Sequence, residues 1–326
     1  MKTIIDPNTF FKGIHKASKS LLDNYQNDCH DKYIKTKKFK KYKEFKDLLV
    51  KGLYTSKPHK NTCYASQGCT EIDDITLITS YDTCFDHKHR IRPSRHDSNN
   101  SILDIIDKNG RVKTLYFDNT SHVGGIAYSP KHKRIYVSRA NANSKTPYAR
   151  VNTYSIETVA ELKNNDTILD YTEIALKNNK KVSYLTIDDN DLLVGEFEEK
   201  QESKLVRYLL NSYGTEVKLK EEYIVPYFKV QGVTTFIKDN KKYYAFSCSY
   251  GRRKNSTLII AKLKDKTLET IKEIKLPCMS EQVSTDTNGN LMILFESDSI
   301  KYGQGLLPSK TSISNVCHLD INKILK

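Results

Sequence analysis

The sequence lacks the features that define membrane-spanning proteins and several common enzyme classes. No apolar run approaches the 18 or more residues that a transmembrane helix needs. Asp6 and Pro7 follow the first five residues so closely that we expect no ordinary secretory signal peptide. GxSxG, HExxH, a phosphate-binding loop and a dinucleotide-binding glycine fingerprint are all missing, so the enzyme classes built on them lose support.

Cysteine pairs of the CxxC type are also missing, and the seven cysteines are an odd number. Both facts argue against a zinc knuckle and against a dense disulfide framework. Reduced thiols in the cytoplasm are the simplest account. If the protein is exported by another route, one bridge from Cys63 to either Cys69 or Cys84 stays open.

Acidic residues are scarce in the first fifth of the chain. Residues 1–60 carry 15 lysines, no arginine and 6 acidic residues, a net charge of +9 out of +14 for all 326 residues. Asp6 and Pro7 are suited to begin a helix, and apolar residues recur at helical spacing over 10–25 and 39–53. We therefore expect a basic α-helical segment over residues 1–58, packed on a second domain over 59–326. The alternative is contact of residues 32–54 with a polyanion, a nucleic acid or a membrane surface.

The period of the pattern changes after residue 60 to short alternating runs rich in β-branched and aromatic residues. Paired runs begin near residues 67, 122, 183, 231 and 282, and further strand-like runs follow each pair. A four-stranded unit that repeats every roughly 50 residues is typical of a β-propeller blade. The sequence thus predicts a mainly β, five-bladed propeller, with a segment near 60–65 completing the last blade. A sixth blade would have to lie within 156–180.

The doublets Gln67-Gly68, Gly124-Gly125 and Gln231-Gly232, which open innermost strands, are similar to those of bacterial propellers of uncertain role. More distantly, residues 62–326 resemble the strictosidine-synthase and gluconolactonase type of propeller. The resemblance is architectural, since the WD dipeptide, the Kelch glycine pair and the Asp-box are absent. It therefore implies a fold and no catalytic residue.

The propeller geometry predicts where polar side chains gather. In an antiparallel blade, the start of the innermost strand lies beside the end of the second strand, so both open on the same face of the disc. Strand starts bring Gln67, His122, Gln231 and Glu281 to that face, and strand ends bring Asp82, Arg139, Glu196, Tyr250 and Glu296. Arg252 lies in a loop on the cationic rim. The opposite turns, at 73–74, 188–190 and 287–289, are expected to be plain hairpin connections.

This predicted mouth favours recognition of a small anionic or carbohydrate-like ligand. The residues assigned to ligand binding are Gln67, Arg139, Gln231, Tyr250 and Arg252, which offer amides and matching positive charge. Each could instead be structural, because propeller channels are lined with polar groups. Asp82 and Glu296 could pair with Arg139.

Hydrolysis of the ligand is the second hypothesis. Its acids and bases would come from Asp82, Glu196, Glu281, Glu296 and His122. The activity would be glycosidase-like, or lactonase- or esterase-like with a divalent cation such as calcium. No residue is assigned as a metal ligand, since the spacing of Cys84, His87, His89 and His96 matches no zinc site. The other alternative is a monomeric, non-enzymatic platform for protein interactions.

Overall fold

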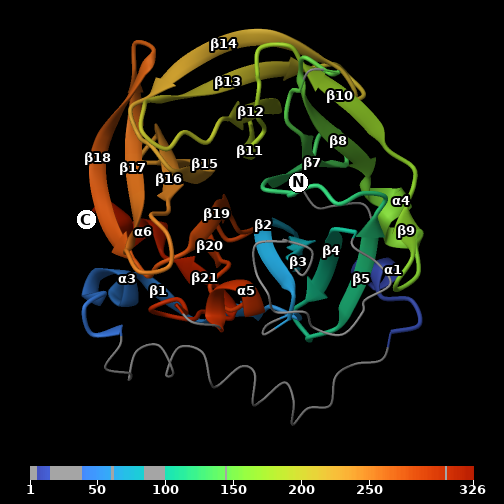
Figure 1. Cartoon of the computed structure of the whole chain (residues 1–326), viewed down its shortest axis with the longest axis horizontal. Helices are drawn as coiled ribbons and strands as arrows, with labels where there is room; N and C mark the ends of the chain where they lie inside the picture. Colours follow the sequence, from blue (N-terminus) through green and yellow to red (C-terminus); the bar gives the residue numbers. More distant parts are fainter. Residues whose placement is uncertain (1–5, 15–38, 60–61, 84–99, 144, 305–306) are drawn as a thin grey trace.

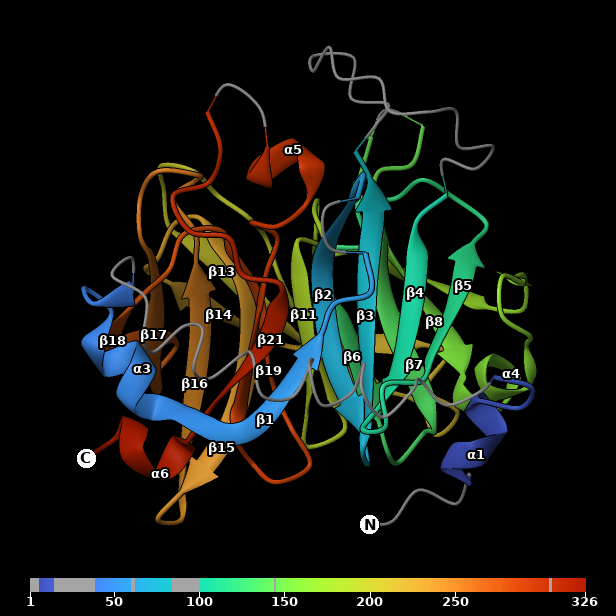
Figure 2. The ribbon, with the colours of Figure 1, turned by 90° about the horizontal axis from the view of Figure 1, so that it is seen from below.

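The computed structural model describes residues 6–14, 39–59, 62–83, 100–143, 145–304 and 307–326. In this part of the chain, antiparallel sheets stand side by side around a central axis (Figure 1). The view from the side shows the strands running between the two faces of the disc (Figure 2). This radial arrangement is that of a β-propeller, and the predicted mainly β propeller is confirmed.

The described strands form five four-stranded antiparallel groups. From the inside outward, the first group is β2 (Tyr64–Ile72), β3 (Ile75–Asp82), β4 (Ile102–Asp107) and β5 (Val112–Phe117). The second is β6 (Ile126–Ser129), β7 (Arg134–Ala140), β8 (Ala149–Ser155) and β10 (Thr172–Leu176). The third is β11 (Tyr184–Asp188), β12 (Asp191–Gly195), β13 (Ser203–Leu210) and β14 (Val217–Val225). The fourth is β15 (Val230–Lys238), β16 (Lys241–Cys248), β17 (Ser256–Lys264) and β18 (Thr267–Leu276). The fifth is β19 (Ser280–Thr285), β20 (Leu291–Phe295), β21 (Asn315–Leu319) and β1 (Leu49–Ser56).

Two short parallel pairings occur at the outer edges of these groups. A parallel bridge between Ile224 of β14 and Thr267 of β18 joins the third and fourth groups into one eight-stranded sheet. The short strand β9 (Thr167–Ile168) pairs in parallel with β5.

The innermost strands β2, β6, β11, β15 and β19 pack against one another in a closed ring. Segments more than 200 residues apart in the sequence therefore meet at the axis, which is the convergence that the predicted mouth requires. The core lies between the sheets, and clusters of buried apolar side chains fill it. All five residues of β20, Leu-Met-Ile-Leu-Phe, are buried, whereas the outer strand β5 alternates between buried and half-buried residues.

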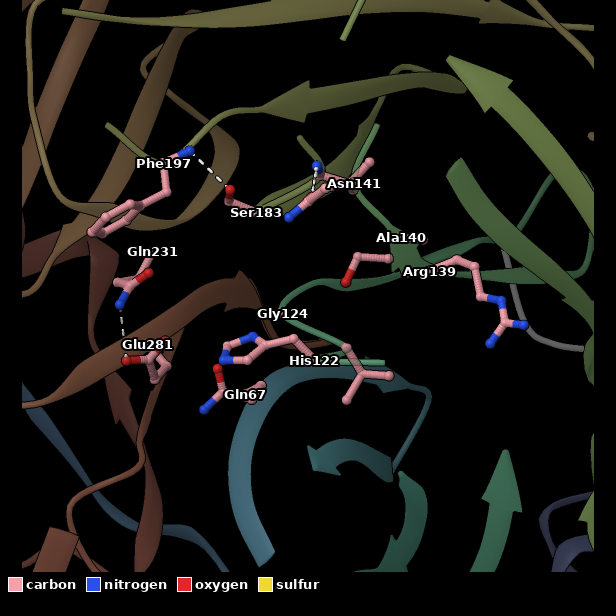
Figure 3. A pocket seen from close by; sticks show the side chains of 13 residues that line it. Gln67, His122, Gly124, Arg139, Ala140, Asn141, Ser183, Phe197, Gln231 and Glu281 are labelled. Atoms are coloured by element: carbon pink, nitrogen blue, oxygen red, sulfur yellow. Dashed lines mark hydrogen bonds between the residues drawn. The ribbon is translucent and has the colours of Figure 1, made fainter. Parts of the chain in front are cut away.

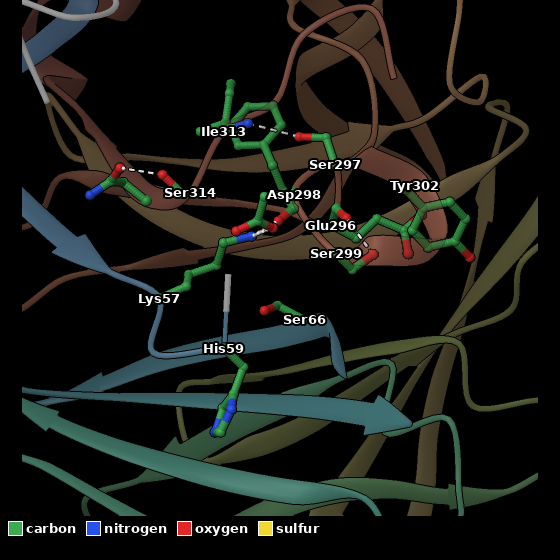
Figure 4. Close-up of polar contacts among 12 residues, drawn as sticks. Lys57, His59, Ser66, Glu296, Ser297, Asp298, Ser299, Tyr302, Ile313 and Ser314 are labelled. Carbon is green, nitrogen blue, oxygen red and sulfur yellow. Dashed lines mark hydrogen bonds and ion pairs between the residues drawn. The ribbon is translucent and has the colours of Figure 1, made fainter. Parts of the chain in front are cut away.

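The strand that completes the fifth group comes from the N-terminal side of the chain. β1 pairs antiparallel with β21, with Ser56 opposite Asn315. Directly after β1, the Lys57 ammonium group donates to the Phe295 carbonyl and forms a buried ion pair with Asp298 (Figure 4). The prediction that residues 60–65 supply this strand is wrong, because Tyr64 already begins β2.

The described residues do not support the predicted N-terminal helical segment. Asp6 caps α1 (Pro7–Phe10) by accepting from the Asn8 amide at 2.9 Å, but this helix has only four residues. The lysine-rich stretch is helical only in α3 (Lys43–Leu48), and Leu49 begins β1. Residues 49–56 thus belong to a propeller sheet, because pairing with β21 prevails over the helical spacing of their apolar residues. The first part of the predicted polyanion-contacting stretch 32–54, residues 32–38, lies outside the described residues.

Residues 156–180 contain no additional sheet. They form α4 (Ile156–Glu161), β9 and β10, and β10 is the fourth strand of the second group. The remaining described helices are α5 (Ile300–Gly303) and α6 (Ile321–Ile324). Among the described residues, no helix is long and apolar enough to cross a membrane.

The cysteines differ in part from the reduced state expected from the sequence. Cys63 is disulfide-bonded. Cys69, Cys248, Cys278 and Cys317 are free and buried, so a bridge from Cys63 to Cys69 is ruled out.

Candidate ligand-binding site

Three innermost strands carry a bulge at the equivalent position, near the start of the strand. The pairing register shifts between Ser66 and Gly68 in β2, between Val230 and Gly232 in β15, and between Ser280 and Val283 in β19. A bulge places an extra residue in the strand and re-aims its side chain. The residues at these bulges include Gln67, Gln231 and Glu281, and all three line one cavity.

The glycines of the Gln-Gly doublets let the inner strands approach the axis. A Cβ on Gly232 would lie 2.5 Å from the Val283 backbone nitrogen, and one on Gly68 would lie 2.8 Å from the Gln282 Oε1 atom. Neither separation leaves room for a side chain. The doublet pattern therefore reflects a packing constraint at the narrowest part of the channel, with the glutamine directed toward the mouth.

The cavity at this face has a volume of about 410 Å³ (Figure 3), within the roughly 300–1,000 Å³ of small-molecule sites. It contains four of the predicted mouth residues, Gln67, His122, Gln231 and Glu281. Arg139 also lines it, but its guanidinium group is directed away from these residues in Figure 3 and forms an ion pair with Asp118 at 3.8 Å.

Two carboxyl groups are in direct contact at the floor of the cavity. Glu281 and Glu296 are hydrogen-bonded to each other and both side chains are buried. Burial raises the pKa of both groups, and the neighbouring Glu296 charge raises the pKa of Glu281 further, well above its ordinary value. Two carboxyl groups this close cannot both carry a charge at low cost, so we describe them as a pair that shares one proton.

Two glutamine amides hold this pair in place. The Gln67 Nε2 atom donates to the Glu296 Oε2 atom at 2.9 Å and to the Ser66 carbonyl at 3.1 Å. The Gln231 Nε2 atom donates to the Glu281 Oε1 atom at 3.2 Å. The pair thereby orients both amides, and the carbonyl oxygen of each amide is left to accept a bond from a ligand.

His122 contributes a neutral imidazole to the cavity. The side chain is exposed to the cavity, but the ring lies deep among protein atoms and packs on Tyr81 with 4.3 Å between ring centroids. This desolvation, together with the Lys301 charge, lowers the pKa of His122 to about 4. At neutral pH the ring thus offers one donor and one acceptor.

An aromatic and cationic group lies beside the mouth, outside the residues that line the cavity. Lys301 of α5 donates to the Tyr81 hydroxyl at 3.2 Å and lies over the rings of Tyr81 and Tyr302. The Arg252 guanidinium lies 4.9 Å from the Tyr302 ring centroid, so Arg252 is engaged in a cation–π contact. Tyr302 also contacts the Tyr81 hydroxyl at 3.1 Å; Tyr302 and Glu296 appear together in Figure 4.

The other predicted site residues do not join the cavity. Glu196 accepts from the Asn179 side chain at 3.1 Å and the Lys180 amide at 2.9 Å, which explains its burial without a ligand. Asp82, at the end of β3, pairs across the ladder with Tyr64. Tyr250 packs edge-on against Phe228 at 6.0 Å. The expected pairing of Arg139 with Asp82 or Glu296 is replaced by its ion pair with Asp118.

The sequence did not reveal several residues that complete the cavity. Ser138 and Asn141 come from the end of β7 and the loop after it, and Ser183 precedes β11. Phe197, whose backbone amide donates to the Ser183 hydroxyl at 2.8 Å, provides an aromatic side chain in the wall. Ser138 could have been predicted from its position near the end of a strand. Nothing in the sequence pattern distinguishes Phe197 from an ordinary loop residue.

No group of three or more metal-ligating side chains occurs among the described residues. The cluster from Cys84 to His96 lies outside them. The opposite face is more elaborate than the predicted plain hairpins. It has a second cavity of about 300 Å³ and buried ion pairs in which Arg207 contacts both Asp188 and Asp191, because side chains of adjacent strands gather there as well.

No family model and no curated protein matches the sequence. Among solved structures, the chain is similar to the β-propeller domain of the Trilobed protease from Pyrococcus furiosus, with 14% identity over 72% of this chain and 64% of that chain and a TM-score of 0.36. It is also similar to a GH32 beta-fructofuranosidase of Bombyx mori, with 8% identity over 84% and 61% of the two chains and a TM-score of 0.44.

A third similar structure is the GH43 protein BlXynB of Bacillus licheniformis, in a mutant form. Identity is 10% over 74% of this chain and 50% of that chain, and the TM-score is 0.44. The chain spans between half and two thirds of the length of these three structures. At this level of similarity, none of them carries an argument about function.

Proposed function

We propose that the protein binds a small, neutral, polyhydroxylated ligand, a carbohydrate of mono- or disaccharide size, in the mouth cavity. One observation carries this proposal: the side-chain groups that face the cavity are polar, and none of them presents a positive charge to a ligand. They are three amides, hydroxyl groups, a neutral imidazole and the carboxyl group of Glu281, which shares a proton with Glu296 behind it. The guanidinium of Arg139, the one cationic group in the lining, is directed away.

The groups offered by the cavity match what a sugar requires. Each hydroxyl of a sugar is both a donor and an acceptor. The carbonyl oxygens of Gln67 and Gln231 can accept a bond from it, and the neutral His122 ring supplies one donor and one acceptor. The amides of Gln67 and Gln231 are already held by the carboxyl pair, so little side-chain freedom is lost on binding. The Phe197 side chain adds an apolar surface for the C–H face of a ring.

The carboxyl pair favours binding rather than hydrolysis. Glycosidases hold their two carboxyl groups about 5–5.5 Å apart in retaining enzymes and about 6.5–9.5 Å apart in inverting ones. Glu281 and Glu296 touch through a hydrogen bond, which leaves no space for a sugar carbon or a water between them. Asp82 and Glu196, the other carboxylates considered, are outside the cavity lining.

We also infer that the propeller has five blades. The support is the five four-stranded groups and the closed ring of five innermost strands. The resemblance to strictosidine-synthase and gluconolactonase propellers stays a prediction.

The test is calorimetric titration with neutral hexoses, pentoses and disaccharides, alongside the matching uronic acids and sugar phosphates. We expect saturable binding of at least one neutral sugar and weaker binding of its acidic analogue. The variants Gln67→Leu and Gln231→Leu should each weaken binding about tenfold, since one hydrogen bond to a ligand is worth about 1 kcal/mol or more. The control is Gln201→Leu, at an exposed glutamine whose amide contacts Glu198.

Stronger binding of the acidic analogues would contradict a neutral ligand. Release of monosaccharides on long incubation, detected by chromatography and lost in Glu281→Gln, would contradict pure binding.

A further inference from the structure

The opposite end of the central channel holds a second cavity that shares no lining residue with the mouth. Its volume is about 300 Å³, and all five innermost strands contribute to its wall. It lies at the face where the sequence predicted plain hairpin turns.

The Gln282 side chain lies across the channel and separates the two cavities. Its Oε1 atom accepts from the backbone amides of Ile126 at 2.9 Å and Cys69 at 3.3 Å, and its Nε2 atom donates to the Ile126 carbonyl at 2.6 Å. Strands β2, β6 and β19 are thus bonded together at the narrowest level. Glu281 lines the mouth and the next residue, Gln282, lines the second cavity. Adjacent residues of β19 therefore face two different cavities.

Threonine hydroxyl groups surround the second cavity at equivalent positions of the inner strands. Thr70 of β2, Thr186 of β11 and Thr234 of β15 line it and are 8%, 7% and 3% exposed. Their hydroxyl groups have no hydrogen-bond partner within the described part of the chain. Ser284 occupies the corresponding position in β19. These hydroxyl groups are accessible from the cavity, so they can bond to a ligand that enters it.

The charged residues of the lining are all acidic: Glu71, Asp73 and Asp286. Asp286 is in contact with His318, whose Nδ1 atom lies 2.8 Å from its carboxylate. Glu71 accepts only from the backbone amide and the hydroxyl of Thr287, and no cation pairs with it or with Asp73 among the described residues. The cavity therefore combines unpaired carboxylates with unbonded hydroxyl groups.

We propose that this second cavity binds a small organic ammonium ligand, a primary amine of the size of a diamine or amino alcohol. Its ammonium group donates to the carboxylate of Glu71, and its remaining N–H or O–H groups bond to the hydroxyl groups of the three threonines. A ligand rich in donors and carrying positive charge satisfies both features, whereas an anion would meet only repulsion.

The experiment compares pairs of probes that differ only in charge. Putrescine is titrated against 1,4-butanediol, and ethanolamine against ethylene glycol, by calorimetry at fixed ionic strength with the full chain. We expect saturable binding of an amine and at least tenfold weaker binding of its diol. Glu71→Gln, which keeps the acceptor for Thr287, should weaken amine binding about tenfold or more, because hydrogen bonds to charged groups contribute about 1.5–3 kcal/mol.

Thr234→Val is the second variant, and it should weaken amine binding without removing any charge. Asp74→Asn is the matched control, since this exposed carboxylate is paired with Lys108 outside the lining. Gln231→Leu should leave amine binding unchanged, so failure of the sugar proposal and failure of this one can be told apart. Equal affinity for amine and diol, no saturable binding at millimolar concentration, or an unchanged affinity in both Glu71→Gln and Thr234→Val would overturn the proposal.

Discussion

The carboxyl groups of Glu281 and Glu296 are hydrogen-bonded to each other, and each also accepts a bond from a glutamine of another sheet. The partner of Glu296 is Gln67 in β2, and the partner of Glu281 is Gln231 in β15. The contact therefore joins three of the five innermost strands at the floor of the mouth. It links the protonation of one carboxyl pair to the stability of the ring and to the orientation of the ligand-binding amides.

The first prediction concerns the pH dependence of stability. The folded pKa of Glu281 is raised above its unfolded value, so the folded state binds more protons, and stability falls as pH rises from the unfolded pKa toward the folded one. Each unit of pKa difference corresponds to about 1.4 kcal/mol. Thermal denaturation between pH 4 and 8 should show this decline in the wild type and a flatter profile in Glu281→Gln, whose amide mimics the protonated acid. Glu202→Gln, at an exposed position, is the control; equal slopes in the three proteins would refute the shared proton.

The second prediction concerns the ion pair of Lys57, which directly follows β1, the strand that completes the fifth group. Its ammonium group is paired with the buried Asp298, and removal of one partner of a buried ion pair costs about 3–5 kcal/mol. Lys57→Met should lower the free energy of unfolding by this amount in urea denaturation. The double variant Lys57→Met/Asp298→Asn should recover part of the loss, because it removes the unpaired charge. A single variant as stable as the wild type would show that the pair does not fix β1 in place.

The third prediction concerns the glycines at the channel axis. A Cβ at Gly232 would meet backbone atoms of Gln282 and Val283, whereas a Cβ at Gly68 would meet side-chain atoms of Thr79, Gln282 and Ile126. Side chains can move more easily than backbone. Gly68→Ala should therefore cost about 1–3 kcal/mol, as overpacking commonly does, and Gly232→Ala should cost more. Chemical denaturation measures both, and the reverse order would contradict this account of the doublets.

The fourth prediction concerns Lys113, which is buried in β5. Its ammonium group donates to the carbonyls of Val159, Ala160 and Leu162 at 3.0, 2.9 and 2.7 Å, at the end of α4. Lys113→Met leaves these carbonyls without their donor, at a cost of about 1–3 kcal/mol. Hydrogen exchange in α4 should be faster in Lys113→Met than in the wild type, whereas exchange in the inner strands should be unchanged. Lys108→Met, at the exposed pair with Asp74, is the control and should change little; a similar effect in both variants would argue against a specific role for Lys113.

The local pattern of the sequence was sufficient for the propeller and for the convergence of its mouth. Alternation of apolar residues, turn residues and the repeat of paired runs are short-range features, and a strand must bury its apolar face whatever the details of the fold. The same logic placed Gln67, His122, Gln231 and Glu281 at one opening, because the direction of a strand fixes which end reaches which face.

Only the tertiary structure decided which of these residues touch. The contact of Glu281 with Glu296, the outward direction of Arg139 and the neutral state of His122 depend on bulges, rotamers and burial, which involve atoms distant in the sequence. The assignment of Leu49 to a strand is similar: its helical spacing is real, but an unpaired edge of β21 offered hydrogen bonds that the helix did not. The gathering of Thr70, Thr186 and Thr234 around the second cavity could not be predicted either. Each is an ordinary strand residue in the sequence, and only the meeting of the inner strands around one axis brings them together.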